Sequence, residues 1–512
     1  MGLSGYSASK FARRVGYGLK FGEAISVDPV EWASAQLSSI PKLGVIQPDG
    51  SNLLNDANFH KNKEHVPIPE MSEAVKLWGQ LHNRWMEINE LADTMPPSEW
   101  DQLMYEEVYF RRADIVQWRD CLCRTSTAAH GEASVFEKFW TFWVNHFAVH
   151  ARHFTKLFYG PHTRIIRNHM LGHFNDLARN AILNPAMLEY LDNIFSTGPN
   201  SLMVKKKWDK GATINENLAR EVLELHTIGT AAGFNQDDVI QLTYALTGWG
   251  IYSGKKDELE RLTIRGQEFG VYFEPRRHEP GDRNIFGLSI PFNDKGMDQA
   301  PMAIDKLSQR PETIERLSLK LARYFISDDP PVDVVQKIVT TWNETNGFLP
   351  AIHRTVVEQC YKHIDDTKKL STSEEWLFQL YRTTGAKIPT SPPKPNYLHH
   401  RSSQIFINQL CSELGQPYDE VPQPDGWPAS KEYWLSSALL ERKIRFAKVF
   451  VDQSKGEEEV LIEIIRRDYD GKTKKLNEID AIIEDIKTLK YNSQRKKRLA
   501  LLYSCSPNFL YT

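Results

Sequence analysis

The sequence predicts a predominantly all-α, multi-helix fold with a small β-hairpin region near residues 262–292. Along most of the chain, apolar residues recur at intervals of three and four, which is the spacing of one helix face. Residues 262–292 differ, because short β-branched and aromatic stretches alternate there with Gly and Pro. Hydrophobic residues make up 41% of the 512 residues, which is enough for a large buried core.

Four regions are expected in chain order. An N-terminal helical region spans 1–130, and a helical core with the hairpin spans 131–292. A second helical lobe spans 293–450. Residues 451–512 interleave Lys and Arg with Asp and Glu, which is typical of a solvent-facing helical pair. The Pro-rich segment 388–397 is expected to connect helices as a linker or a strap.

The charge balance and the N-terminal residues limit the classes of partner and compartment. Lys and Arg number 63 against 66 Asp and Glu, so no basic surface for nucleic acid is expected. No run approaches the roughly 18 apolar residues of a membrane span, and the N-terminus lacks the apolar stretch of a secretory signal. The five cysteines are odd in number and scattered. We therefore expect a cytoplasmic protein without a membrane span.

Residues 214–228 contain the clearest predicted helix. Thr213 and Glu216 match the Ser/Thr-x-x-Glu capping box, and Gly229 is expected to end the helix. At about 100° per residue, His226 lies on the apolar side, about 160° from Glu224. The charged side is expected to contain Glu216, Asn217, Arg220, Glu221 and Glu224.

This helix allows structural as well as functional interpretations. His226 and Glu224 cannot chelate one ion from a single helix, because they point in nearly opposite directions. In the structural interpretation, Glu216 caps the helix, Arg220 pairs with Glu224, and His226 is a hydrogen-bonded core residue.

Six of the 16 histidines fall within residues 146–173, namely His146, His150, His153, His162, His169 and His173. His146, His150 and His153 have the spacing of one helical stripe, and His169 and His173 repeat the interval of four. Imidazoles four residues apart on a helix can hold zinc, iron or copper. Two alternatives remain open: polar tips of an aromatic core, and an anion pocket shared with Arg152, Arg164 and Arg167.

A predicted helix before residue 250 and a histidine after it are two further features. Asn235 and Asp238 are expected to open a helix that Gly248 ends. His278 lies in the hairpin region and could reach a cleft from a loop. The sequence contains no Walker loop, Gly-x-Ser-x-Gly elbow, strand-linked GxGxxG, HExxH or kinase motif set, which disfavours the corresponding chemistries.

Several segments together resemble an uncharacterised bacterial family, domain of unknown function 1800. They are FWVNHF (142–147), NHMLGHFNDLARNAILNPAMLEYLDN (168–193), NENLAREVLELHTIGTAAGFNQDDVIQLTYALTGW (215–249), HEPGDRNIFG (278–287), GQPYDEVPQPDGWP (415–428) and SPNF (506–509). The resemblance covers nearly the whole chain. It implies a protein of a family whose members are often exported and whose genes often neighbour those of a sulfatase-like or phosphatase-like protein.

The resemblance also selects residues. It picks out Asn145, His146, His169, Asp192, Asn193, Asn215, Glu216, Arg220, Glu221, Glu224, His226, Asp238, Trp249 and His278. It does not pick out His150, His153 or His173, and Val144 stands where the family tends to have another histidine. The expected site therefore joins His146 and His169 to the 215–226 segment.

Residues and resemblance together predict a helical enzyme with a His/Glu/Arg pocket. The expected catalytic residues are His146, Arg220, Glu221, Glu224 and His226. A divalent transition metal, if one binds, is expected on His146, His169, Glu221 and Glu224. Further candidates are Asn145, Asp192, Asn215, Asp238 and His278. Arg220 would orient an anionic substrate.

Two other functions are weighed against an enzyme. In the first, the protein is a non-enzymatic accessory or scaffold for the sulfatase-like partner, and the charged residues form a buried polar network. In the second, which is less favoured, tryptophans serve as platforms for carbohydrate, although most tryptophans are core residues.

Overall fold

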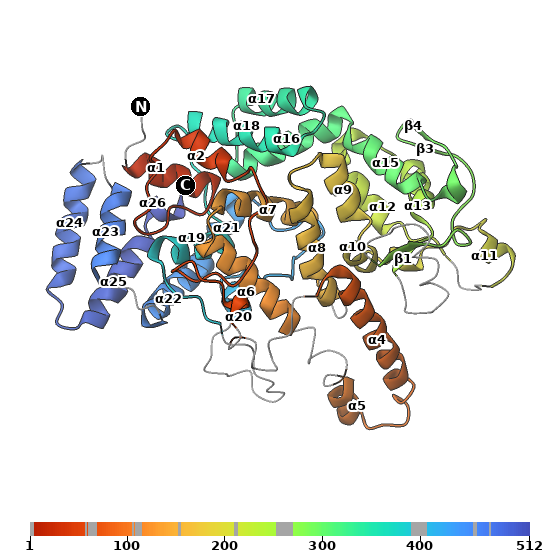
Figure 1. Ribbon diagram of the computed structural model, residues 1–512, viewed down its shortest axis with the longest axis horizontal. Helices are drawn as coiled ribbons and strands as arrows, with labels where there is room; N and C mark the ends of the chain where they lie inside the picture. The colour runs from red at the N-terminus through yellow and green to blue at the C-terminus, as the bar shows by residue number, and fades with distance from the viewer. Residues whose placement is uncertain are drawn as a thin grey trace.

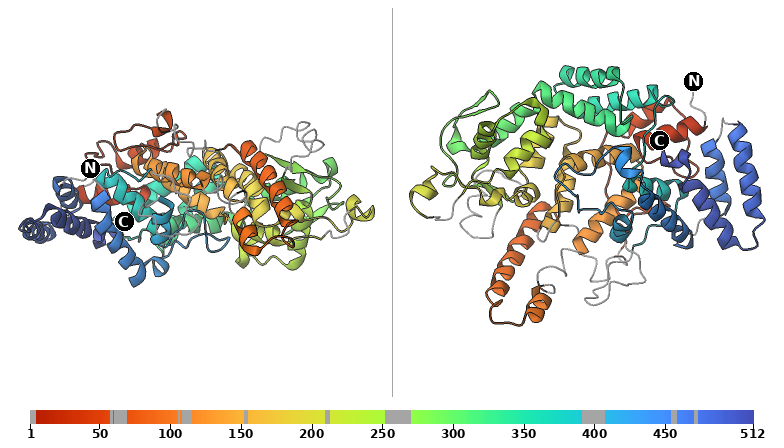
Figure 2. Two further views of the ribbon diagram at one scale, coloured as in Figure 1. Left: turned by 90° about the horizontal axis from the view of Figure 1, so that it is seen from below. Right: turned by 180° about the vertical axis from the view of Figure 1, so that it is seen from behind.

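The computed structural model describes residues 5–56, 59, 69–104, 107, 115–151, 155–208, 213–251, 270–390, 407–453, 458–469 and 473–512. Over these residues the fold is predominantly α-helical, as the sequence predicts. Helix α24 (Thr473–Lys487) stands at one end of a long, flat molecule and α11 (Leu202–Lys205) at the other (Figures 1 and 2). Helices α4 (Met71–Asn89) and α5 (Pro97–Met104) project from one long edge (Figure 1).

The centre of the fold is α7 (Ser134–His146), whose side chains are all buried except that of Asn145. Its sequence is mostly apolar, and even its charged residues Glu137 and Lys138 are buried, so the helix is stable only when other elements surround it. It contacts α6 (Ile115–His130) and α8 (Lys156–His169) on either side in sequence. Because of this burial, the C-terminal end of α7 lies deep within the protein.

Two apolar clusters form the core. The first contains side chains of α7 together with those of α9 (Phe174–Ile182), α10 (Pro185–Tyr190), α12 (Asn217–Glu221), α13 (Gln236–Leu246), α15 (Gln299–Ser308), α16 (Pro311–Phe325), α17 (Val332–Glu344) and α18 (Leu349–Lys362). The second contains side chains of α6 together with those of α19 (Ser373–Thr384), α20 (Ile407–Glu413), α22 (Ser437–Gln453), α23 (Glu458–Tyr469) and α25 (Asn492–Ser504).

The hairpin region contains two small antiparallel pairs. Strand β1 (Trp249–Ile251) pairs with β2 (Val271–Phe273), and β3 (Arg283–Ile285) pairs with β4 (Leu288–Ile290). The prediction of hairpins near 262–292 is confirmed, although β1 begins earlier than that range. Residues 252–269 lie outside the described part of the chain.

The C-terminal region forms three long helices, α23, α24 and α25, rather than the expected pair. Each of them buries apolar side chains, for example Ile465, Ile483 and Leu499. The interleaved charges therefore occupy the outer faces, while a separate apolar stripe fixes each helix. The Pro-rich connector predicted at 388–397 lies mostly outside the described residues.

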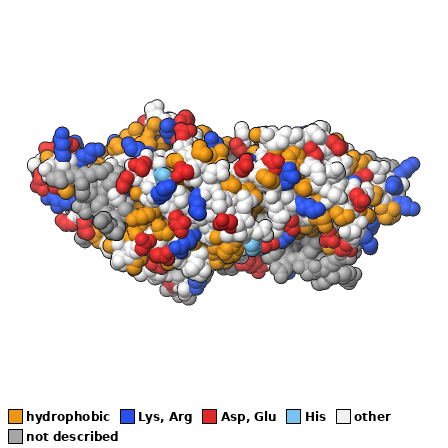
Figure 3. Space-filling model, turned by 90° about the horizontal axis from the view of Figure 1, so that it is seen from above, with side chains coloured by type: hydrophobic (Ala, Val, Ile, Leu, Met, Phe, Trp, Pro, Cys, Tyr) orange, Lys and Arg blue, Asp and Glu red, His pale blue; other side chains and the backbone are white. Residues whose placement is uncertain are grey.

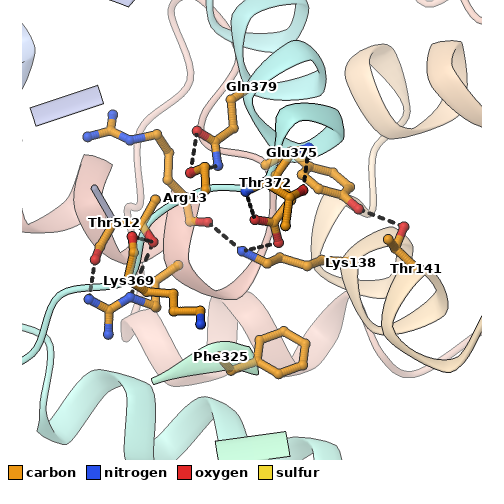
Figure 4. A network of polar contacts seen from close by, with 12 residues as sticks. Arg13, Lys138, Thr141, Phe325, Lys369, Thr372, Glu375, Gln379 and Thr512 are labelled. Carbon is orange, nitrogen blue, oxygen red and sulfur yellow. Dashed lines mark hydrogen bonds and ion pairs between the residues drawn. The ribbon is translucent and has the colours of Figure 1, made fainter. Parts of the chain in front are cut away.

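Buried polar contacts connect the two ends of the chain. In α1 (Gly5–Val15), Arg13 pairs with Asp468 at 2.8 Å between Nη1 and Oδ2. Lys138 of α7 lies between the Arg13 carbonyl oxygen and a Glu375 carboxylate oxygen, each 3.2 Å from Nζ (Figure 4). Because these buried charges have partners, we interpret this network as structural.

The face seen from above mixes hydrophobic, acidic and basic side chains without a large area of one kind (Figure 3). This mixture agrees with a formal net charge of only −3.

Candidate functional site

The stripe expected from His146, His150 and His153 is not formed, because α7 ends at His146. Beyond this point the chain turns toward a remote segment, and His150 Nδ1 lies 2.7 Å from the Val421 carbonyl oxygen. His153 lies outside the described residues. Contacts with a distant loop thus replace the helical continuation that the spacing predicts.

His169 and His173 also do not share a helix. Helix α8 ends at His169, and His173 is the N-cap of α9. His169 Nδ1 lies 2.9 Å from the Ile165 carbonyl oxygen of its own helix, whereas His173 Nδ1 lies 2.9 Å from that of Asn346. The HxxxH interpretation is therefore wrong at both places, since two histidines must share one helical face to form such a pair.

The helix predicted at 214–228 is shorter and has two geometries. Helix α12 spans Asn217–Glu221, and the π-helix η5 (Val222–His226) continues it. Gly229 adopts a φ of 83°, and its N–H donates to the Leu223 carbonyl oxygen at 2.8 Å, so Gly229 ends the segment as predicted. Single π-helical turns occur frequently at functional sites.

The predicted capping box is wrong. Thr213 forms an isolated bridge with Ser196, which keeps it outside the helix. Glu216 occupies the N-cap position, but its side chain makes no capping bond. Instead, Asn215 Oδ1 accepts a hydrogen bond from the Asn217 N–H at 2.9 Å. The start of the helix is thus fixed by an asparagine one residue before the N-cap.

The predicted division of this helix into two sides is confirmed: Val222 and His226 are buried, while Arg220 and Glu224 are half-buried. The guanidinium of Arg220 binds the preceding turn and also donates from Nη2 to Gln236 Oε1 of α13 at 2.6 Å. Its Nη2 lies 2.9 Å from Glu216 Oε2, whereas Nη1 is 3.9 Å from Glu224 Oε1. Because the Arg220 side chain is 40% exposed, this pair contributes little stability and leaves the guanidinium accessible.

His146 has two polar neighbours at the buried end of α7. Its Nε2 lies 3.3 Å from the His226 carbonyl oxygen, so Nε2 carries the proton and donates it to that oxygen. Nδ1 is then unprotonated and accepts a hydrogen bond from Lys320 Nζ at 3.1 Å. Burial and the positive charges of Lys320 and Arg316 lower the pKa of His146 well below its ordinary value. The imidazole is therefore neutral.

Lys320 is half-buried on α16, one helical turn after Arg316. Burial, assisted by the neighbouring Arg316 charge, lowers the pKa of Lys320 from 10.5 to about 7, while Asp425 opposes the change. Near neutral pH, Lys320 consequently populates both its charged and its neutral forms. A neutral amine next to a neutral imidazole can accept a proton.

Glu221 is the carboxylate with the complementary property. Burial, together with the negative charges of Glu224 and Asp425, raises the pKa of Glu221 from 4.5 to about 7. Asp425 acts on the pKa values of both Lys320 and Glu221, whereas these two groups do not act on the pKa of each other. The carboxylate of Asp425 thus influences an amine and a carboxyl group whose pKa values are both about 7.

The His226 ring lies beside that of His146, with 5.9 Å between their centroids. It is only 1% exposed, and burial lowers its pKa to about 3. Among the described residues, neither ring nitrogen has a hydrogen-bond partner. The interpretation of His226 as a core residue is correct for its burial but not for its hydrogen bonding. An unpaired buried N–H is costly, which marks this position as unusual.

Asn145 and Asp192 have different surroundings. Asn145 Nδ2 donates to the Trp427 carbonyl oxygen at 2.8 Å, and its Oδ1 accepts from the Trp427 N–H at 2.7 Å. Asn145 therefore fixes the 415–430 segment against α7. Asp192 is exposed and has a left-handed φ of 57°, at the turn after α10.

Asp238 and His278 have partners that favour structural roles. The capping box of Asn235 and Asp238 is confirmed at the start of α13, and Asp238 Oδ1 also accepts from the Phe286 N–H at 2.7 Å. His278 is 3% exposed, and its Nε2 lies 3.0 Å from Gln299 Oε1. The structure places this ring in the interior.

Three residues of this region were not predicted: Arg316, Lys320 and Asp425. A signal for two of them exists in the sequence, because Arg316 and Lys320 place like charges at i and i+4 on one helix. Such a pair is destabilising unless tertiary contacts or a function favour it. The position of Asp425 has no comparable signal, since it depends on how a remote loop packs.

The metal set remains a prediction. Among the residues that the structure describes, no group of three or more His, Cys, Asp or Glu side chains is arranged to hold a metal ion. His146 Nδ1 is occupied by Lys320, and His169 Nδ1 lies against its own helix. The arrangement supports proton exchange more directly than metal binding.

Comparisons with known proteins give one match. The model of a family described as Protein of unknown function (DUF1800) matches residues 10–511. Searches of curated proteins and of solved structures found no match. In the described part of the chain, no helix is both long and apolar enough to cross a membrane.

Proposed function

The chain belongs to the DUF1800 family, and from its own residues we propose that it is an enzyme that exchanges protons with an anionic substrate. In this proposal Lys320 and His146 form the basic half of the site, and Glu221 is the acid. The observation that carries the proposal is the 3.1 Å contact between Lys320 Nζ and His146 Nδ1.

The protonation states support these roles. A base and an acid are most effective when their pKa values lie near the working pH. The pKa values of Lys320 and Glu221 are both about 7, reached from opposite directions because burial penalises the charged form of each. The neutral Lys320 amine would take a proton from the substrate, and the protonated Glu221 carboxyl would return one.

The cations near this pair support an anionic substrate. Arg316 lies one turn from Lys320, and its Nη1 donates to the Thr227 carbonyl oxygen at 3.3 Å, which fixes its position. Arg220 presents a partly exposed guanidinium on the same helix as Glu221. Guanidinium groups bind carboxylate, phosphate and sulfate oxygens with two parallel hydrogen bonds.

The test is a turnover screen with phosphate, sulfate and carboxylate esters, followed by comparison of variants on any substrate that reacts. Lys320→Met and Glu221→Gln are each expected to lower kcat at least about 100-fold, the typical contribution of acid–base catalysis. Lys337→Met, on an exposed lysine of α17, is the matched control and should leave kcat unchanged. Unaltered turnover in both site variants, with the fold intact by circular dichroism, would contradict the proposal.

A further inference from the structure

We infer that a second pocket, remote in sequence from the residues above, binds a small phosphomonoester with an aromatic or apolar group. The pocket has a volume of about 390 Å³, within the range of small-molecule sites. It lies where the C-terminal ends of α6 and α19 meet the segment after α1. This inference is independent of the proposed proton exchange.

The charge of the lining is the first argument. Lys20, Arg382 and Lys387 line the pocket together with His130, and no Asp or Glu belongs to this lining among the described residues. Each of the other pockets that the described residues form around Arg124, Lys42 or Arg442 includes a glutamate. A pocket whose charged lining residues are all cations favours an anion.

His130 lines the same pocket but adds no positive charge to it. It is 3% exposed, and its Nε2 has no hydrogen-bond partner among the described residues. Burial and the adjacent Arg382 and Lys20 charges lower the pKa of His130 to about 4, against a hydrogen bond to the Ala386 backbone. Because Nε2 is buried even from the pocket, a phosphate would meet the lysines of the lining rather than this ring.

The cations are already positioned for a ligand. Arg382 Nη1 donates to the Gly131 carbonyl oxygen at 2.7 Å. This bond fixes the guanidinium at the C-terminal end of α6, where its charge interacts favourably with the helix dipole. Its Nη2 also lies 3.4 Å from Oε2 of Glu23, which is not part of the pocket lining. Lys20 Nζ pairs with Glu132, whose side chain is 88% exposed. Such an exposed pair is weak, and a ligand phosphate could replace the glutamate.

The remaining lining points to the second part of the ligand. Phe21 lines the pocket and is 42% exposed, next to Pro48 and Val460. An exposed aromatic ring beside apolar side chains offers a face on which a ring of the ligand can stack. A phosphate would then meet Lys20 and Lys387, while the organic group lies on Phe21.

Isothermal titration calorimetry of the full chain with phenyl phosphate tests this inference. We expect saturable binding at one site, weakened at least about tenfold in the double variant Lys20→Gln, Lys387→Gln, because each lysine contributes a charge-assisted hydrogen bond. The double variant Lys205→Gln, Lys206→Gln removes the same charge from exposed lysines at the C-terminal end of α11 and should bind as the unaltered chain does.

Three outcomes would overturn the inference. One is the absence of binding by the unaltered chain, which would leave the cations with a structural role only. Another is equal weakening in both double variants, which would indicate nonspecific attraction. The third is binding of benzoate, which has the same ring with a carboxylate, as tight as that of phenyl phosphate. Circular dichroism of each variant shows whether its fold is retained.

Discussion

Replacing Lys320 with Met removes an ammonium group from a half-buried position while keeping an unbranched side chain. The pKa of this lysine is 10.5 ordinarily and about 7 in the folded chain. Between these values, lowering the pH protonates Lys320 in the unfolded state but not in the folded state. The lysine therefore destabilises the fold increasingly as the pH falls from about 10.5 to about 7, and by a constant amount below about 7.

The size of the effect follows from the two pKa values. A difference of about 3.5, at about 1.36 kcal/mol for each pKa unit, corresponds to about 5 kcal/mol. Water reaches part of the side chain and reduces the penalty, so we expect about 2–3 kcal/mol. Lys320→Met should consequently have a higher free energy of unfolding than the unaltered chain near pH 7, and a similar one near pH 10.

Urea unfolding from about pH 6 to about pH 10 measures this difference, and NMR titration of isotope-labelled lysine measures the pKa itself. Lys337→Met, on an exposed lysine, is the control and should show no pH-dependent difference. A difference between Lys320→Met and the unaltered chain that does not change with pH would refute the reasoning, as would a Lys320 resonance that titrates near its ordinary pKa.

Three further variants test other contacts by the same unfolding measurement. Glu221→Gln should stabilise the chain by about 1–2 kcal/mol above pH 7 and not below pH 4.5. The reason is that folding raises the pKa of Glu221 from 4.5 to about 7, which penalises the charged form. Stabilisation at low pH would contradict this. Asn145→Ala should lower the free energy of unfolding by about 2 kcal/mol, since two hydrogen bonds to the Trp427 backbone are lost. No loss of stability would show that other contacts hold the 415–430 segment. Gly229→Ala should lower the free energy of unfolding more than Gly233→Ala does. Both glycines have a positive φ, but only at Gly229 would the added carbon lie 2.6 Å from a side chain of α16. Equal losses in the two variants would show that this side chain moves aside freely.

Local sequence patterns predicted the features that depend on neighbouring residues. The start of α13 at Asn235 and Asp238, and the end of the η5 segment at Gly229, require only side-chain bonds within one turn or a left-handed φ. The two-sided character of the 217–226 segment follows from helical spacing. These features hold because their causes lie within a few residues of one another.

Spacing failed where remote contacts compete with the helix. His146 and His150 have the interval of one helical face, yet the chain leaves α7 at His146 because its continuation bonds the 415–430 segment. Thr213 is a residue type that often caps helices, but a β-bridge to Ser196 holds it outside the helix. In each case a hydrogen bond to a distant residue replaces the local bond that the pattern predicts.

The sequence by itself determined the helical class, the hairpin region, the family and several helix ends, because these depend on composition and on short-range periodicity. It also selected His146, Glu221 and His226. Only the tertiary structure decided that Lys320 meets His146 across 174 residues. The pKa values of Lys320 and Glu221 likewise depend on burial and on Asp425, and burial is a property of the packed protein that no single segment contains.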